Sequence, residues 1–207
     1  MNKWYIENGE QGDIVISTRV RLARNLEDYP FPCRLTVKGK EAVCEEIKNA
    51  VLSSDSWGFN YTKMKDFSEA QAVSLAERHL ISPEFASDRA GRGLLLTDDE
   101  AISVMLCEED HIRIQVMMSG LALKEAYNVA DKVDNTISSK LNYAYDDRIG
   151  CLTQCPTNLG TAMRASVMVH LPALTRCGQI GRLASTVSKL GLVLRGAYGE
   201  GSSPKGD

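Results

Sequence analysis

Three strand-like segments follow one another in the middle of the chain, and this succession constrains the fold more than any other feature. Gly93 to Thr97 and Ala101 to Cys107 are apolar runs separated by the turn Asp98 to Glu100. Ile112 to Met118 follows after a short acidic segment. Connections this short favour antiparallel pairing, because a parallel crossover needs about a dozen residues or more. We therefore expect an α+β fold with an antiparallel sheet flanked by helices.

The remaining elements surround this central meander. Four segments have apolar residues at helical spacing, and Ser68 with Gln71 fits a capping box at the start of one of them. The expected helices are Lys38 to Leu52, Ser68 to Leu80, Leu121 to Ile137 and Gln179 to Leu190. Further strands are expected at the buried entry Ile14 to Ile16, at Ala165 to Leu171 and at Leu192 to Leu194, with a hairpin or strand edge at Asn142 to Ile149 and loop from Ser53 to Lys65.

The composition, 43% hydrophobic and 25% charged, predicts one globular domain over residues 1–207. A net charge of −3 gives no basis for nucleic-acid binding, and no apolar run approaches the ~20 residues that cross a bilayer. Residues 1–12 lack a signal-peptide core, so we expect a cytoplasmic protein with reduced cysteines. The six cysteines form no C-x-x-C pair and the three histidines are scattered, so no metal site is expected.

Alternating arginines mark the first strand. Ser17, Arg19 and Arg21 share one face if the chain is extended there, because side chains alternate along a strand. Two guanidinium groups on one face repel each other unless an anion lies between them. A solvated polar face is the simple alternative. A polyphosphate is the natural ligand otherwise, since guanidinium binds phosphate in bidentate fashion.

A second candidate site lies between Cys151 and His170. Cys155 precedes the turn-forming residues Pro156 to Thr161, and Arg164 follows them closely. A thiol, a backbone loop and a cation this close together suggest that the segment meets an anion. A structural turn beside a buried cysteine is the alternative.

Arginines at strand positions in several separate stretches predict a highly charged anionic ligand. A nucleoside triphosphate with a divalent metal fits this requirement, although the chain has no G-x-x-x-x-G-K-[ST] loop. Mg²⁺ would then be held mainly through phosphates and water. The carboxylates Glu109 and Glu200 and the thiol Cys155 suggest a guanidinium acceptor, which needs a base and alignment before it can attack. The arginines concerned are Arg19, Arg21, Arg113, Arg164 and Arg195.

Four segments together resemble the catalytic domain of the guanidino (phosphagen) kinases, in the same order along the chain. They are Ser17 to Arg21, Glu108 to Arg113, Cys155 to Ser166 and Arg195 to Glu200, and the run CPTNLGT is the most specific. The resemblance implies a glutamine-synthetase-like catalytic fold and ATP as phosphoryl donor. It also implies that Glu109 orients and deprotonates the guanidine, that Glu200 is a second acidic partner and that Cys155 lies beside the guanidinium. The implied phosphate ligands are Ser17, Arg19, Arg21, Arg113, Arg164 and Arg195.

The chain departs from the family members that act on small substrates. Leu96 and Met168 stand where those members commonly carry histidine, and Tyr198 replaces an arginine. Only sixteen residues precede Ser17, where those members have a helical domain that helps to enclose the acceptor. We therefore expect a more open site whose acceptor is an arginine side chain within a protein.

The likeness is closest to the bacterial branch of the family that phosphorylates arginine in proteins. It implies a role in protein quality control and the stress response, with exposed arginines of protein substrates as acceptors. An activator protein, a Clp-type protease and a homodimer of the full-length protein are the implied partners. The catalytic domain is expected to be incomplete at its C-terminal end. A kinase of free arginine or another small guanidine, and an inactive nucleotide- or substrate-binding fragment, remain as alternatives.

Overall fold

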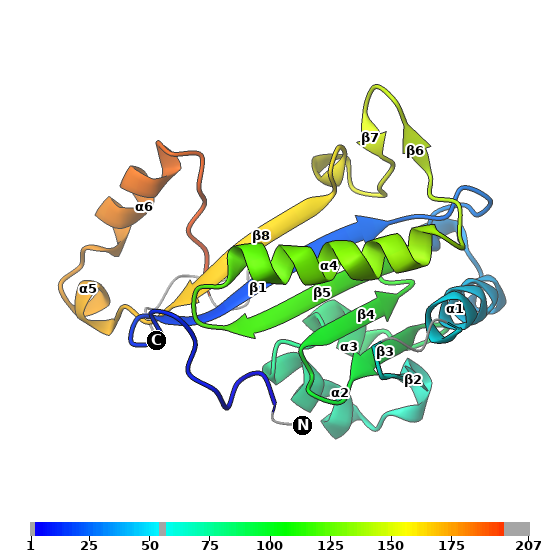
Figure 1. Cartoon of the computed structure of the whole chain (residues 1–207), viewed down its shortest axis with the longest axis horizontal. Helices are drawn as coiled ribbons and strands as arrows, with labels where there is room; N and C mark the ends of the chain where they lie inside the picture. Colours follow the sequence, from blue (N-terminus) through cyan, green and yellow to red (C-terminus); the bar gives the residue numbers. More distant parts are fainter. Residues whose placement is uncertain (1–2, 54–56, 197–207) are drawn as a thin grey trace.

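The computed structural model describes residues 3–53 and 57–196. Its centre is an antiparallel sheet of six strands in the order β2-β3-β4-β5-β1-β8 (Figure 1). The predicted α+β class with an antiparallel sheet is thus confirmed. The sheet consists of β1 (Val15–Arg24), β2 (Phe59–Lys63), β3 (Gly93–Thr97), β4 (Ile102–Leu106), β5 (Ile112–Ser119) and β8 (Met163–Val169), and β6 (Tyr145–Asp146) pairs with β7 (Gly150–Cys151) in a separate small hairpin.

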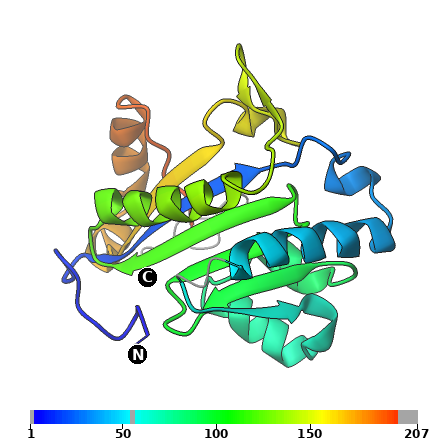
Figure 2. The ribbon, with the colours of Figure 1, turned by 45° about the vertical axis from the view of Figure 1, so that its right-hand side comes forward.

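The two longest helices, α1 and α4, cover one face of the sheet, and Figure 2 shows them on the same side of it. Their apolar stripes pack against alternate strand residues such as Val20, Val104 and Ile114, which are at most 1% exposed. Thr18 connects this face to α4, because its Oγ1 accepts from Ala122 N and donates to Gly120 O. The helices are α1 (Val37–Leu52), α2 (Glu69–Glu77), α3 (Pro83–Ser87), α4 (Leu123–Ser138), α5 (Pro172–Arg176) and α6 (Ile180–Ser188).

The opposite face of the sheet is covered over only part of its width. There α2, α3 and the residues around them enclose a second core against β3 and β4, with Phe85, Leu94 and Met105 almost fully buried. The same face of β5, β1 and β8 carries polar and charged side chains instead. Arg113 on β5 pairs with the core residue Met105 on β4, and Ala23 on β1 pairs with Arg113, so all three residues lie on this face. This uncovered half of the sheet is where the candidate site lies.

The N-terminal segment, residues 3–12, lies against the ends of the central strands. Trp4 N donates to Asp99 O in the turn between β3 and β4, and Leu121 N donates to Glu10 O. The approach near Ser119 requires glycine, since a Cβ on Gly9 would lie 2.1 Å from the carbonyl oxygen of Ser119. The segment therefore belongs to the packed structure of this edge.

Most expected elements are found within a few residues of their predicted bounds. The capping box at Ser68 and Gln71 is confirmed, with Gln71 N donating to Ser68 Oγ and Ser68 N to Gln71 Oε1. That helix is shorter than predicted: α2 ends at Glu77, and His79 adopts the left-handed conformation at φ +58°. Gly191, expected at the end of the last predicted helix, has φ +78° three residues after α6.

Three predictions about the strands were wrong. Phe59–Lys63 was assigned to a loop but forms β2, an edge strand that pairs only with β3 and therefore lacks a buried apolar pattern. Ile14 and Ile16 were expected to be buried, but they are 48% and 43% exposed, and only Val15 between them is buried, at 6% exposure. Leu192 to Leu194 form no strand, since no described strand pairs with them.

Candidate active site

A cleft of about 1010 Å³ lies over the uncovered half of the sheet. Its floor comes from β1, β5 and β8, and one wall comes from the turn between α2 and α3. The facing wall comes from the 3₁₀ turn Pro156–Asn158 and its neighbours. Six arginines line this cleft. Five of them are the arginines predicted from the sequence, and they come from four separate parts of the chain: Arg19, Arg21, Arg113, Arg164 and Arg195. The sixth, Arg92, forms an ion pair with Asp88.

Strand register explains how these arginines come together. Arg21 on β1 pairs directly with Arg164 on β8, and Arg113 on β5 lies opposite Ala23, two residues further along β1. Side chains two residues apart on one strand share a face, and directly paired residues on neighbouring strands share it as well. Arg19, Arg21, Arg113 and Arg164 therefore all point away from α4 and into the cleft.

The positive charges in the cleft oppose one another. Burial, with the charges of Arg113 and Arg164, lowers the pKa of Arg19 to about 10. Burial and the same neighbours together with Arg19 lower the pKa of Arg21 to about 8, and only Glu108 acts against this shift. Such depression means that the charged guanidinium is disfavoured where it stands. A polyanion in the cleft would remove this cost, so the electrostatics favour a phosphate-rich ligand.

Glu108 neutralises one of these arginines. Its Oε2 accepts from Arg113 Nη1 at 2.7 Å, and its Oε1 accepts from Ser82 Oγ at 2.7 Å. Burial alone would raise the pKa of Glu108, but the charge of Arg113 and the hydrogen bonds from Glu109 N and Ser82 lower it below its usual value. Glu108 is therefore an ionised anchor that fixes Arg113 at the floor of the cleft.

Glu109 has a different environment from that of its neighbour. Burial, followed by the charges of Asp110 and Glu108, raises the pKa of Glu109, while Arg113 and a hydrogen bond from Asn158 oppose the increase. Asn158 Nδ2 donates to Glu109 Oε2 at 3.3 Å, so Glu109 faces the loop that follows Cys155. A carboxylate with a raised pKa in a cleft is suited to accept a proton near neutral pH.

A buried polar network joins this acidic turn to the Cys155 loop. Asp110, which is 2% exposed, accepts from Asn25 Nδ2 at 2.6 Å and from Gln154 N at 2.8 Å. His111 is fully buried and accepts from Leu26 N through Nδ1, while its Nε2 lies 3.0 Å from Pro30 O. Cys155 itself is partly exposed, with its Sγ 3.0 Å from Thr157 Oγ1. Glu109 and Cys155 thus line one cleft as parts of one cross-linked loop pair.

The structure brings most of the predicted site residues together. Glu109 and Cys155 line the cleft with the five arginines named above. Ser17 lies on the same face of β1, but it is 3% exposed and is not part of the lining, so its role as a phosphate ligand stays a prediction. Glu200 and Tyr198 lie outside the described residues. Leu96 packs beside the second core under α2.

Sequence reasoning missed the residues that support the site. Glu108, Asp110 and His111 were seen only as part of an acidic stretch, and Asn25 and Gln154 were not considered. The available signal was the run of three adjacent carboxylates just before a strand that carries an arginine. The hydrogen-bond partners of Asp110 lie far away in the sequence, so no local pattern could predict these contacts.

Two further findings concern all of the residues that the structure describes. Among residues 3–53 and 57–196, the acidic, histidine and cysteine side chains form no group of three or more that would hold a metal ion. None of the helices in this part of the chain is long and apolar enough to span a membrane.

The fold and the cleft define a class of protein. The family model described as ATP:guanido phosphotransferase, C-terminal catalytic domain, matches residues 40–207, and the chain belongs to this family. Among curated relatives, a protein-arginine kinase from Caldanaerobacter subterraneus subsp. tengcongensis is 46% identical over 198 residues, or 94% of this chain. Another from Halothermothrix orenii is 44% identical over 207 residues, or 100% of this chain. The chain spans 59% of the length of each relative.

Solved structures of the same family share the fold. The duplicated taurocyamine kinase from Schistosoma mansoni, with bound transition state analog components, matches 93% of this chain and 28% of its own at a TM-score of 0.83 and 30% identity. Lombricine kinase matches 95% of this chain and 58% of its own at a TM-score of 0.80 and 25% identity. The predicted guanidino kinase fold is therefore confirmed.

Proposed function

We propose that this chain is the catalytic part of a kinase that transfers the γ-phosphoryl group of ATP to the guanidinium of arginine residues in proteins. The observation that carries the proposal is one cleft lined by Glu109, Cys155 and six arginines, five of which were predicted from the sequence as phosphate ligands. The cations suit a triphosphate, and the carboxylate with the thiol suits a cationic acceptor. The names of the curated relatives, protein-arginine kinases at 44–46% identity, support arginine in proteins as that acceptor.

The triphosphate would lie along the floor of the cleft. Arg21 and Arg164, paired across β1 and β8, would bind phosphate oxygens from one side, with Arg19, Arg113 and Arg195 completing the charge. Mg²⁺ would be held through phosphates and water, because the nearest carboxylates are already engaged: Glu108 by Arg113 and Asp110 by Asn25 and Gln154. The ion would neutralise charge on the phosphates during transfer.

Glu109 would prepare the acceptor for attack. A protonated guanidinium is not nucleophilic, so one N–H proton must leave as the nitrogen approaches phosphorus. In the proposed step the new N–P bond forms, the bond from phosphorus to the leaving ADP oxygen breaks, and the proton passes to Glu109. Its raised pKa favours this proton transfer, and the thiol of Cys155 would lie beside the guanidinium. Glu200, outside the described residues, is proposed as the second acidic partner.

The setting of the reaction is part of the same proposal. Protein substrates with exposed arginine are the partners that this chemistry requires. We further propose that the full-length protein is a cytoplasmic dimer that acts in protein quality control and the stress response. Its proposed partners are an activator protein and a Clp-type protease. No nucleic-acid partner is proposed, given the net charge of −3.

The test offers γ-labelled ATP and Mg²⁺ to the chain with an unfolded, arginine-rich protein or with free arginine. Phosphoarginine is then identified by mass spectrometry under conditions that preserve the acid-labile N–P bond. We expect label on protein arginine, and we expect Glu109→Gln to abolish transfer while ATP binding persists. Arg148→Gln, an exposed position in the hairpin of β6 and β7, is the control that should leave transfer unchanged.

Three outcomes would contradict the proposal in different ways. Label on free arginine alone would favour a kinase of small guanidines. ATP binding without transfer to any acceptor would favour a nucleotide-binding fragment. Full transfer by Glu109→Gln would remove the proposed base from the mechanism.

A further inference from the structure

Cys107 has a backbone conformation that is uncommon for any residue other than glycine. It follows directly after β4 with a φ of +59°, and its side chain is fully buried. A residue with a Cβ adopts this left-handed region at a cost in free energy, and such outliers concentrate at functional sites. The turn that begins here, residues 107–111, is the one that carries Glu109.

This conformation changes the side of the sheet to which the following side chains belong. At the end of β4, Met105 packs in the second core and Leu106 packs in the core under α1 and α4, as strand alternation requires. Continued alternation would place Cys107 on the cleft face and Glu108 in the apolar core. Instead, Cys107 joins Leu106 in the core under α1 and α4, and Glu108 lines the cleft. The positive φ of Cys107 accounts for this exchange of sides.

The side chain of Cys107 is held by α1, on the face of the sheet opposite the cleft. Its Sγ donates to Lys40 O at 3.7 Å. Cys44 on the same helix is 2% exposed, and its Sγ donates to Gly91 O at 3.4 Å. A hydrogen bond with Cys107, followed by burial, raises the pKa of the Cys44 thiol, which is therefore uncharged. The contact between Cys107 and α1 is thus one of packing and weak hydrogen bonds.

On the cleft side, the same turn presents its carboxylates in fixed positions. Cys107 N donates to His111 O at 3.0 Å and closes the turn. Glu108 Oε2 accepts from Arg113 Nη1 at 2.7 Å and from Glu109 N at 2.9 Å, so the backbone of Glu109 is tied to its neighbour. A turn that sent Glu108 to the other side of the sheet would lose both contacts, and Glu109 would move with it.

We propose that Cys107 is a positioning residue whose left-handed backbone directs Glu108 onto Arg113 and thereby places Glu109 beside the acceptor. The inference rests on the proposed function, since it concerns the proposed base of the same cleft. Cys107 itself does not line the cleft, because its side chain packs under α1 and α4. The backbone conformation does the positioning and the thiol does not, so substitutions can separate the two.

The test measures kcat for phosphoryl transfer from Mg-ATP to an unfolded, arginine-rich protein in two variants that both lack the thiol. Cys107→Val opposes a positive φ, because valine is β-branched. Cys107→Gly adopts the φ of +59° without strain. Calorimetry with Mg-tripolyphosphate, a phosphate chain without a nucleoside, reports the anion site separately. The kcat is counted per molecule that binds tripolyphosphate, so that unfolded chain does not contribute.

We expect kcat to fall about ten-fold or more in Cys107→Val and to stay within about three-fold of the unaltered value in Cys107→Gly. The Kd for tripolyphosphate should change by less than about two-fold in both variants, because the arginines of β1 and β8 bind it. Cys44→Ala removes the neighbouring thiol at an ordinary helical position and is the control that should leave kcat unchanged.

Unchanged kcat in Cys107→Val would overturn the inference while leaving the proposed function intact. A fall of more than three-fold in Cys107→Gly would also overturn it, because the thiol would then be needed. Equal losses of kcat and of tripolyphosphate affinity in Cys107→Val would do the same, since the substitution would then disturb the whole cleft. If Cys107→Val yields no folded chain, Cys107→Gly decides by the same three-fold limit. Absence of phosphoarginine with the unaltered chain would contradict the proposed function itself, and the inference with it.

Discussion

The carboxylate of Asp110 accepts a hydrogen bond from the backbone N–H of Gln154 at 2.8 Å, across 44 residues of sequence. This contact joins the turn that carries Glu109 to the loop that carries Cys155. The same carboxylate oxygen accepts from Asn25 Nδ2, so the end of β1 is tied into the junction as well. The spacing of the proposed base and the proposed thiol is thus set by a residue that touches neither ligand.

Replacing Asp110 by alanine should separate the two loops and destabilise the protein. Two buried donors would lose their acceptor, and we expect the free energy of unfolding in urea to fall by about 2–3 kcal/mol. In the surviving folded protein, KM for the proposed arginine acceptor should rise more than the Kd for tripolyphosphate, a phosphate chain without a nucleoside that we expect to bind the arginines of the floor. Asp147→Ala, exposed in the turn between β6 and β7, should change neither quantity. Equal losses for acceptor and tripolyphosphate would show that Asp110 supports the whole cleft.

The pH dependence of transfer should report Glu109. Because its pKa is raised and the base must be unprotonated, kcat/KM should increase with pH through a value above that of an ordinary glutamate. The hydrogen bond from Asn158 opposes the increase in pKa, so Asn158→Ala should move this acid limb to still higher pH. Asn128→Ala on the exposed side of α4 should leave it in place. A shift to lower pH in Asn158→Ala would contradict the assignment of Glu109 as the base.

Arg21→Met should stabilise the protein and impair ligand binding at the same time. The substitution removes one of several half-buried cations that repel one another. We therefore expect the free energy of unfolding without ligand to increase by about 1 kcal/mol. The rise in Tm that tripolyphosphate causes in the unaltered chain should be much smaller in the variant. Arg176→Met, exposed on α5, provides the comparison for a surface arginine. A less stable variant that still binds tripolyphosphate fully would count against a built anion site.

Arg24 should behave in the opposite way, although it belongs to the same strand. Its side chain is 10% exposed and pairs with Asp134 on α4 through Nε and Nη2, with Nη1 donating to Thr161 O. Arg24→Met leaves Asp134 largely buried and without its cation, so the free energy of unfolding should fall by about 3 kcal/mol. The affinity for tripolyphosphate should persist in the folded fraction. Arg182→Met on α6 serves as an exposed control, and a binding defect in Arg24→Met would place this residue in the anion site.

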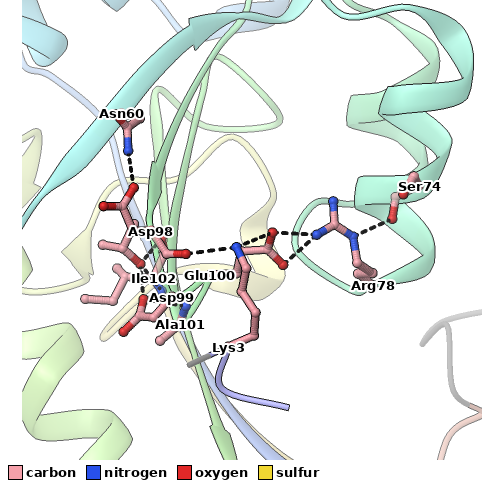
Figure 3. A network of polar contacts seen from close by, with 10 residues as sticks. Lys3, Asn60, Ser74, Arg78, Asp98, Asp99, Glu100, Ala101 and Ile102 are labelled. Atoms are coloured by element: carbon pink, nitrogen blue, oxygen red, sulfur yellow. Dashed lines mark hydrogen bonds and ion pairs between the residues drawn. The ribbon is translucent and has the colours of Figure 1, made fainter. Parts of the chain in front are cut away.

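Glu100→Gln should destabilise the junction between the N-terminal segment, the end of α2 and the turn between β3 and β4. The substitution keeps the shape of the side chain but removes the charge that holds Lys3 and Arg78, so the contacts drawn in Figure 3 should weaken. We expect the free energy of unfolding in urea to fall by about 1–2 kcal/mol, because two charge-assisted hydrogen-bond partners of a nearly buried carboxylate are weakened. Asp98→Asn, at an exposed position in the same turn, is the control. An unchanged free energy of unfolding in Glu100→Gln would show that the charge of Glu100 does not hold this junction.

The sequence predicted those parts of the fold that repeat locally. The meander from β3 to β5 could be inferred because its connections are too short for any other pairing, and the arginine face of β1 because side chains alternate along a strand. The edge strand β2 escaped notice because it pairs with one neighbour only and is nowhere fully buried. The end of α2 was placed too late because apolar spacing continues through Leu80, although His79 leaves the helical conformation.

Much of the candidate site depended on contacts that no local pattern records. The carboxylates of Glu108, Glu109 and Asp110 are adjacent in sequence, yet one pairs with Arg113, one faces Asn158 and one is buried on Asn25. Their different pKa shifts arise from these partners, which come from other strands and loops. Residue type alone therefore indicated an acidic turn. Only the packing shows that Glu108 is neutralised by Arg113, that Glu109 has a raised pKa and that Asp110 joins two loops.

The pairing of Arg21 with Arg164 has a consequence for how this chain can misfold. The strand β8 lies at the end of the sheet and is held there mainly by β1, with an irregularity between Val15 and Ser17. Slippage of β8 by one residue would keep nearly all of its backbone pairing but rotate Arg164 to the far side of the sheet. Such a misregistered chain would keep most of its secondary structure but would lose Arg164 from the cleft, and we expect it to bind the proposed nucleotide only weakly.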